Sequence, residues 1–122
     1  MTDRKYEPLE NLVSDFRSGA KQGVTALTFL AVTALAQQGK SYFDLNEVYN
    51  YIQNNLLKKL SSKPTFLREF SIISLAPTLG KLCDMGVLEK IGDNPARYRT
   101  KLPLSVLQRY AGEIYNELMN YI

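Results

Sequence analysis

The sequence predicts a mainly helical α+β domain that carries a small β-hairpin. Apolar residues recur at three- and four-residue spacing through most of the chain, which indicates amphipathic helices. Residues 87–101 instead alternate around a Gly-Asp-Asn-Pro turn, which is typical of two antiparallel strands. The chain has 122 residues, of which 45% are apolar and 22% are charged, so it is long enough for one globular core and short for two.

Two helices are expected in the N-terminal part. Pro8 can open a short first helix, because its missing N–H has no helical partner in the first turn. The apolar positions of this helix are Leu9, Leu12, Val13 and Phe16. The second helix, from Val24 to Gln38, is apolar on most sides and therefore predicted to be buried. It stops at Gly39, a residue that tolerates a left-handed C-cap.

A short strand and a third helix follow. Residues 41–43 are aromatic enough for a strand of one bridge. Asp44 is a suitable N-cap, and Glu47 three residues later is its capping-box partner. The helix ends at Lys58 and Lys59, cations at the end where the helix dipole favours them.

A fourth helix and the hairpin come next. Ser74 is expected to cap the helix, which runs to about Met85 and has Pro77 in its first turn. Its predicted buried positions are Leu75, Leu79 and Leu82. Gly86 ends the helix, and the strands are expected at residues 87–91 and 96–101. Arg97 and Arg99 then project from one face of the second strand, and Tyr98 from the other.

The last helix follows Pro103 and has a three-four apolar spacing close to a heptad stripe. The stripe consists of Leu104, Leu107, Ala111, Ile114 and Leu118. This helix either folds back onto its own domain or pairs with a second copy, and its large apolar surface favours the pair. The expected division is an N-terminal extension with a short helix at 1–22, a central domain at 23–102 and a dimerisation helix at 103–122.

Composition argues against several classes of function. The chain has no histidine and one cysteine, Cys83, which removes the commonest general base and the Cys and His ligands of zinc. We therefore expect neither an enzyme nor a cofactor or metal site. No apolar stretch reaches the roughly 20 residues of a membrane span, and no signal peptide is recognisable, so a cytoplasmic protein without a membrane partner is expected.

Positive charge is concentrated in one part of the chain. The net charge is only +3, but residues 58–101 carry nine basic and four acidic side chains. The segments before and after this part are each slightly acidic. A surface that neutralises phosphates requires such clustering, because affinity for nucleic acid comes largely from phosphate contacts.

The stretch from Leu79 to Lys90, followed by Ala96 to Thr100, resembles the end of the recognition helix and the wing of many bacterial and archaeal winged helix-turn-helix regulators. Residues 24–52 also look like the opening of the PadR-like branch. The resemblance implies a winged helix with an additional C-terminal helix, and that helix builds the dimer in PadR-like proteins. It also implies a homodimeric, sequence-specific regulator of transcription that binds double-stranded DNA.

The resemblance assigns residues to three parts of a DNA interface. The recognition helix would present Ser74, Ala76, Pro77, Thr78 and Lys81 to the major groove. The wing would present Lys90, Arg97, Arg99 and Lys101 to the DNA. Lys58, Lys59, Lys63 and Arg68 would hold the DNA backbone from the other side. The alternative is a winged helix that contacts another protein within a larger assembly, since few of the recognition-helix residues can read a base.

Overall fold

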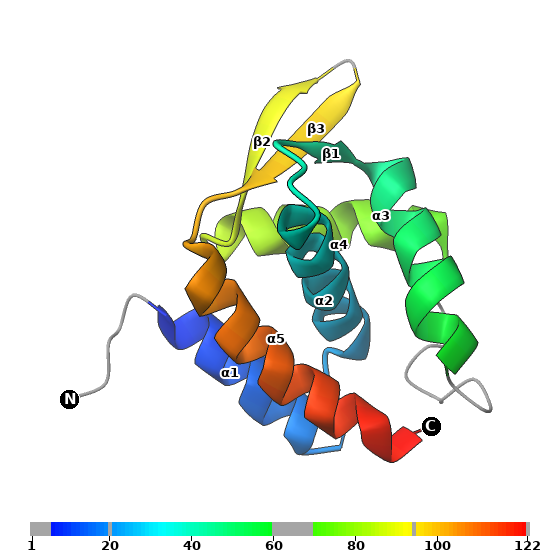
Figure 1. Ribbon diagram of the computed structural model, residues 1–122, viewed down its shortest axis with the longest axis vertical. Helices are drawn as coiled ribbons and strands as arrows, with labels where there is room; N and C mark the ends of the chain where they lie inside the picture. Colours follow the sequence, from blue (N-terminus) through cyan, green and yellow to red (C-terminus); the bar gives the residue numbers. More distant parts are fainter. Residues whose placement is uncertain (1–5, 20, 60–69, 94, 122) are drawn as a thin grey trace.

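The computed structural model describes residues 6–19, 21–59, 70–93 and 95–121. It is mainly helical with a small antiparallel sheet, as the sequence predicts (Figure 1). The elements are α1 (Glu7–Arg17), α2 (Gly23–Gln37), β1 (Phe43–Asp44), α3 (Leu45–Tyr51), α4 (Ile72–Asp84), β2 (Leu88–Asp93), β3 (Ala96–Thr100) and α5 (Leu104–Leu118). A π-helical turn (Ile52–Leu56) and a 3-10 turn (Leu57–Lys59) continue α3, and a second 3-10 turn (Met119–Tyr121) follows α5.

Helix α2 lies at the centre of the molecule. It is apolar around most of its circumference, and it packs against α1, α3, α4 and α5. Three of its threonines are buried, which requires partners for their hydroxyl groups. Thr28 Oγ1 donates to the carbonyl of Val24 at 2.7 Å, whereas Thr33 Oγ1 has no hydrogen-bond partner in the described part of the chain.

The signals at the ends of α2 and α3 act as predicted. Gly39 follows the C-cap of α2 with a φ of 86°, in the left-handed region where a side chain is unfavourable. Asp44 caps α3, and its carboxylate accepts from the backbone N–H of Glu47 at 2.9 Å. The backbone N–H of Asp44 donates to the Glu47 carboxylate in return, which completes the capping box.

Helix α4 begins earlier than the sequence analysis expects. Its N-cap is Ser71, and Ser74 is the third helical residue, so the prediction that Ser74 caps the helix is wrong. The two serines form a capping box, in which the N–H of Ser74 donates to Ser71 Oγ at 3.3 Å and the N–H of Ser71 donates to Ser74 Oγ at 2.9 Å. Pro77 consequently lies in the second turn rather than the first, where its ring removes a backbone hydrogen bond to Ile73.

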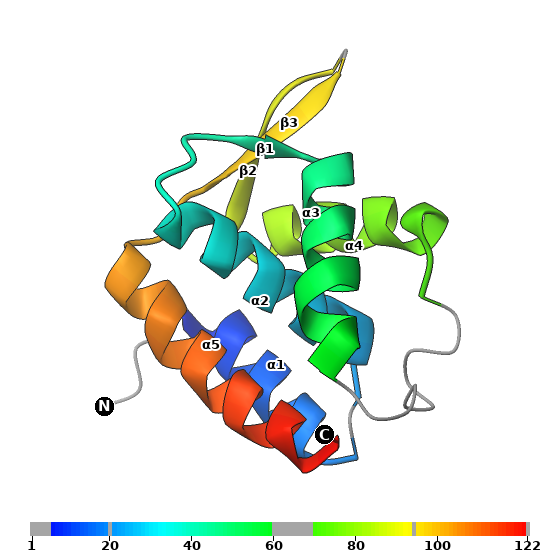
Figure 2. The same cartoon turned by 45° about the vertical axis from the view of Figure 1, so that its right-hand side comes forward.

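The sheet has the order β1-β3-β2, with both pairs antiparallel. Gly86, with a φ of 81°, ends α4 and turns the chain into β2. Phe43 of β1 lies opposite Tyr98 of β3, and both side chains are buried. The sheet thus covers one end of the helical core, and its β2–β3 hairpin extends beyond it (Figures 1 and 2).

Helices α1 and α5 lie side by side at the end opposite the hairpin (Figure 1). The four apolar residues predicted for the first helix are all buried. Four members of the predicted dimerisation stripe are buried in the same chain, with exposed fractions of 0% for Leu107, 8% for Ala111, 1% for Ile114 and 2% for Leu118. Only Leu104, at 39%, is exposed.

The assignment of this stripe to a second copy is therefore wrong for those four residues. They are covered because α5 packs against α1 and α2. Residues of α1 and α5 belong to the same hydrophobic cluster as those of α2, α3 and α4. The described chain consequently has one core, to which the expected N-terminal extension and C-terminal helix both contribute.

Candidate nucleic-acid interface

The β2–β3 hairpin carries the pair of arginines predicted for the wing. In β3, Arg97 and Arg99 are exposed and Tyr98 between them is buried, so the predicted alternation is confirmed. The two guanidinium groups therefore belong to the solvent-facing side of a projecting hairpin (Figure 2). A rigid, exposed strand with two arginines on one face can contact successive phosphates.

Tyr42 positions one of these arginines. The guanidinium carbon of Arg97 lies 4.8 Å from the centre of the Tyr42 ring, a distance at which the ring's negative face attracts the cation. Tyr42 precedes β1 and is 49% exposed, so it supports Arg97 without removing it from solvent. Tyr42 was not predicted as a partner of Arg97, because only the pairing of β1 with β3 brings residues 42 and 97 together.

Glu89 pairs with the other arginine. Glu89 of β2 lies directly opposite Arg99, and Nε of Arg99 donates to the Glu89 carboxylate at 3.0 Å. The hydrogen bond from Arg99, together with its charge, lowers the pKa of Glu89 and so favours the charged carboxylate. Glu89 therefore competes with any phosphate for Arg99, a pairing that depends on the register of β2 and β3 and was not predicted.

The two lysines predicted for the wing are also on the hairpin. Lys90 in β2 and Lys101 directly after β3 are both exposed. The backbone N–H of Lys101 donates to the carbonyl of Val87 at 2.9 Å, which fixes the chain where the hairpin joins the core. All four predicted wing residues thus belong to the hairpin or its base, but Lys90 lies opposite Tyr98 and projects from the face that Arg97 and Arg99 do not use.

The polar groups predicted to read bases on α4 are already engaged within the chain. Ser74 Oγ donates to the carbonyl of Ser71 at 2.8 Å and accepts in the capping box. Thr78 Oγ1 donates to the carbonyl of Ser74 at 2.9 Å. Lys81 is exposed, and its Nζ donates to the side-chain oxygen of Gln22, which precedes α2. Little uncommitted polar chemistry therefore remains on this helix.

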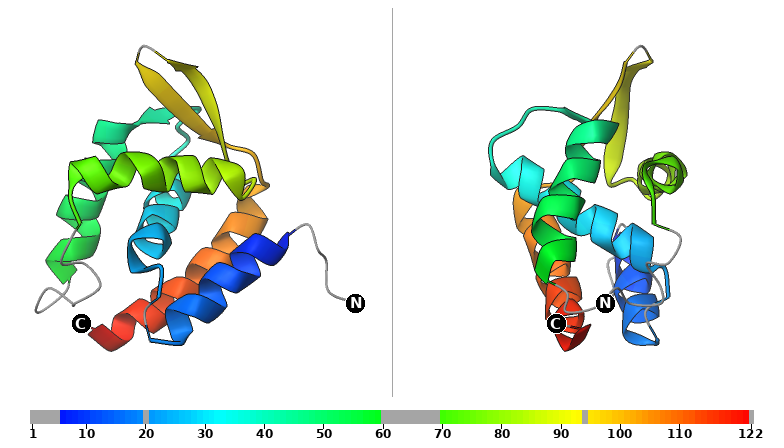
Figure 3. Two further views of the ribbon diagram at one scale, coloured as in Figure 1. Left: turned by 180° about the vertical axis from the view of Figure 1, so that it is seen from behind. Right: turned by 90° about the vertical axis from the view of Figure 1, so that its right-hand side faces the viewer.

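The exposed side of α4 is instead apolar over its first turns. Ile73 is 82% exposed and Ile72 is 38% exposed, and Ala76 and Pro77 are exposed beside them. We call these four residues the outer face of α4. The opposite side of the helix is buried through Leu75, Leu79 and Leu82, as predicted. Figure 3 shows α4 lying across the back of the molecule with the hairpin above it.

The residues predicted to hold the DNA backbone are not brought to the hairpin. Lys58 and Lys59 are exposed in the turn after α3, at the end of that segment away from the sheet (Figure 1). Nζ of Lys59 donates to the Tyr115 hydroxyl at 3.2 Å and lies 5.3 Å from the centre of its ring. Lys63 and Arg68 lie outside the described residues. Lys59 thus contacts α5 rather than joining the wing.

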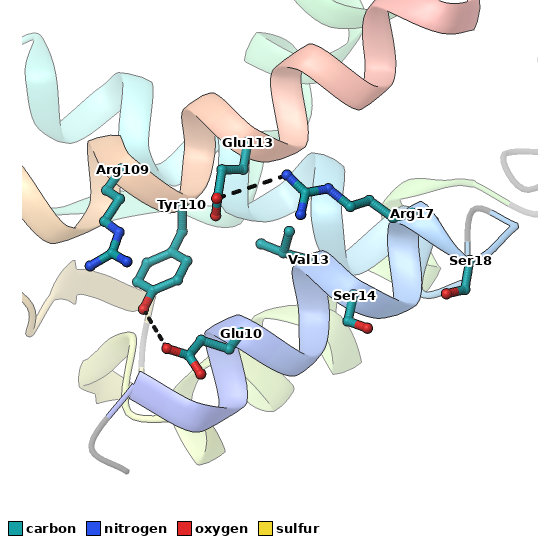
Figure 4. A pocket seen from close by; sticks show the side chains of 8 residues that line it. All are labelled: Glu10, Val13, Ser14, Arg17, Ser18, Arg109, Tyr110 and Glu113. Carbon is teal, nitrogen blue, oxygen red and sulfur yellow. Dashed lines mark hydrogen bonds and ion pairs between the residues drawn. The ribbon is translucent and has the colours of Figure 1, made fainter. Parts of the chain in front are cut away.

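Several hollows lie away from this interface, and two of them border α5. One, of about 320 Å³, lies between α1 and α5 and is bordered by ion-paired and hydrogen-bonded groups (Figure 4). There the Tyr110 hydroxyl donates to the Glu10 carboxylate at 3.2 Å, and Arg17 pairs with Glu113 at 3.8 Å. Burial and the Glu10 charge raise the pKa of Tyr110. These contacts hold α1 against α5.

The second hollow, of about 260 Å³, lies between α2, the π-helical turn and α5. Small residues at Ala34, Ala111 and Gly112 leave this space, and Thr33 lies among its lining residues. The hollow is open on one side to solvent, where Lys59 and Tyr115 border it. We assign no ligand to it.

The described residues outside the hairpin offer few groups for catalysis or metal binding. Burial raises the pKa of the Cys83 thiol, which disfavours the reactive thiolate. The described residues contain no group of three acidic or cysteine side chains arranged to hold a metal ion. Within the same ranges, every helix is too short or too polar to cross a bilayer.

Comparison of the chain with protein-family models, curated proteins and solved structures finds no match.

Proposed function

We propose that the chain is a winged-helix protein that binds double-stranded DNA in a sequence-specific manner and regulates transcription. The order α2, β1, α3, α4, β2, β3 supports the proposal, because helix, short strand, two helices and a two-stranded hairpin is the order that the resemblance implies. In this motif α4 is the recognition helix and the β2–β3 hairpin is the wing.

The observation that carries the proposal is the exposed pair of arginines on the hairpin. Arg97 and Arg99 face solvent together, Lys101 follows them along the chain, and the hairpin lies above α4 (Figure 3). Lys90 lies opposite Tyr98 and therefore projects from the other face of the hairpin. Arginine binds phosphate oxygens with two parallel N–H groups, so the wing supplies affinity for the DNA backbone. The proposal does not extend to a PadR-like dimer, because the apolar stripe of α5 is used within the chain.

Charge reversal on the wing tests the proposal. The double variant Arg97→Glu and Arg99→Glu should bind every duplex more weakly than the parent chain. Its dependence of log affinity on log salt should also be less steep by about 2, since each lost phosphate contact removes about 0.9 from the slope. Affinity is measured by fluorescence anisotropy with a labelled random duplex over a series of salt concentrations.

Arg17→Glu and Arg109→Glu provide the matched control, since this double variant has the same net charge. Both residues are exposed, on α1 and α5, and border the hollow between these two helices (Figure 4). The control should retain most of the parent's salt slope. Equal affinity and equal slope in the wing variant and the parent would remove the wing from the DNA interface.

A protein partner is the second candidate, and the 82% exposure of Ile73 favours it. An exposed apolar group on a helix is a common anchor for another protein. Chromatography on immobilised random duplex DNA separates the candidates. Retention that falls steeply with salt supports DNA binding, whereas absence of retention at low salt supports a protein partner.

A further inference from the structure

The apolar side chains on the outer face of α4 restrict the kind of partner that this helix can recognise. A recognition helix commonly reads bases with hydrogen-bonding side chains. Here Ile72, Ile73, Ala76 and Pro77 occupy the exposed side, and none of them has a polar side-chain atom. The partner that this face reads must therefore offer an apolar group.

The hydroxyl groups of the neighbouring residues are engaged within α4 and are not free to supply the polar contacts that this face lacks. Ser74 is the one polar residue in the segment from Ile72 to Pro77, and its hydroxyl donates and accepts in the cap of α4. Using it for a base would open the capping box, which typically costs about 1 kcal/mol of helix stability (about fivefold in an equilibrium). The Thr78 hydroxyl bonds back to the helix, so its methyl group is the more available part of the side chain.

Duplex DNA offers one apolar group in its major groove, the C5 methyl of thymine. The charge beside α4 favours DNA as the occupant of this face, because the hairpin above it carries Arg97, Arg99, Lys90 and Lys101. These cations would neutralise phosphates along one edge of a groove that α4 enters. A protein partner would have to complement both the apolar face and this basic hairpin.

We infer that the outer face of α4 reads thymine methyl groups, and that Ile73 is its main specificity-determining residue. This inference rests on the proposed function. The substrate class is then a duplex with thymines at the major-groove positions facing the N-terminal half of α4. Ile73 carries the largest exposed apolar surface on the helix. Ile72, Ala76 and Pro77 extend the apolar contact to neighbouring positions.

Replacing thymine by deoxyuridine tests this inference, because it removes the methyl and keeps the base pair. A binding-site selection from random duplexes first supplies the preferred sequence, which is then synthesised with thymine or with deoxyuridine. We expect about fourfold weaker binding for each contacted methyl that is lost (about 0.8 kcal/mol, at about 1.4 kcal/mol per tenfold). Ile73→Ala should lower the ratio of the two affinities by about fourfold, the value expected for one contacted methyl, and leave the salt slope unchanged.

Leu104→Ala is the matched control, because Leu104 is an aliphatic residue that is 39% exposed at the start of α5. It should preserve both the thymine preference and the salt slope. Salt-dependent binding with equal affinity for both duplexes, or selected sites without thymine, would overturn the inference and leave the proposed function standing. Absence of salt-dependent binding to any duplex would overturn both and assign the face to a protein partner.

Discussion

Truncation of Leu107 tests whether α5 belongs to the core of its own chain. Leu107 has no exposed surface, and α5 packs against α1 and α2. Leu107→Ala removes three buried carbons and leaves a cavity, and such changes cost about 2–5 kcal/mol in well-packed cores. We expect a loss of about 3 kcal/mol in the free energy of unfolding, which is about 10 °C in Tm for a domain of this size.

Urea denaturation followed by far-UV circular dichroism measures this loss at two protein concentrations. Because the cavity lies within one chain, the loss should be independent of concentration, whereas a stripe buried between two copies would make stability concentration-dependent. Leu104→Ala, with 39% exposure in the same helix, should cost less than about 1 kcal/mol. A loss below about 1 kcal/mol for Leu107→Ala, or a midpoint that rises with concentration, would refute the placement of α5.

Three further predictions concern stability. Thr33→Val should stabilise the chain by about 1 kcal/mol in urea denaturation, because it replaces by a methyl group a buried hydroxyl that has no hydrogen-bond partner among the described residues; destabilisation would show that the hydroxyl is satisfied. Pro77→Ala should raise stability by about 1–3 kcal/mol by restoring the hydrogen bond to Ile73, and an unchanged Tm would contradict this. Tyr110→Phe should cost about 1 kcal/mol near neutral pH through loss of the bond to Glu10. Because folding raises the pKa of Tyr110 above its usual 10.0, the folded chain favours the neutral phenol, so the advantage of the parent over Tyr110→Phe should shrink as the pH rises through and beyond that value; an advantage that grows there would reverse the sign.

The ends of the helices and the exposed face of β3 were predicted from residues that lie close together in the sequence. Asp44 and Glu47 form the predicted capping box, and Gly39 and Gly86 have the positive φ values expected of residues that end helices. The alternation around Tyr98 likewise gives the correct exposed face of β3. These features depend on residues three or fewer positions apart, so their energetics are contained in the sequence itself.

The first residue of α4 could not be predicted uniquely, because two serines near its start can each act as the N-cap. Ser71 and Ser74 have the same chemistry, and either can cap a helix that buries Leu75. The structure uses Ser71 as the cap and Ser74 as its partner, which lengthens the helix by nearly one turn. Ile72 and Ile73 then join the exposed side of α4, and the residues available for reading DNA change with them.

Contacts between elements that are far apart in the sequence could not be predicted from the sequence. An apolar stripe predicts that one side of a helix is buried, but it does not identify the partner surface. For α5 that surface belongs to α1 and α2. The contacts of Arg97 with Tyr42 and of Arg99 with Glu89 likewise depend on sheet order and register, which the spacing within each segment leaves open.

The proposed interface separates affinity from specificity in a way that experiments can resolve. Phosphate contacts by Arg97 and Arg99 depend on counterion release and weaken with salt. Methyl contacts by Ile73 bury apolar surface, which salt affects little. Raising the salt concentration should therefore weaken binding to the thymine and deoxyuridine duplexes in parallel and leave their ratio nearly constant. A ratio that collapses with salt would mean that the preference arises from the shape or charge of the DNA backbone rather than from the methyl groups.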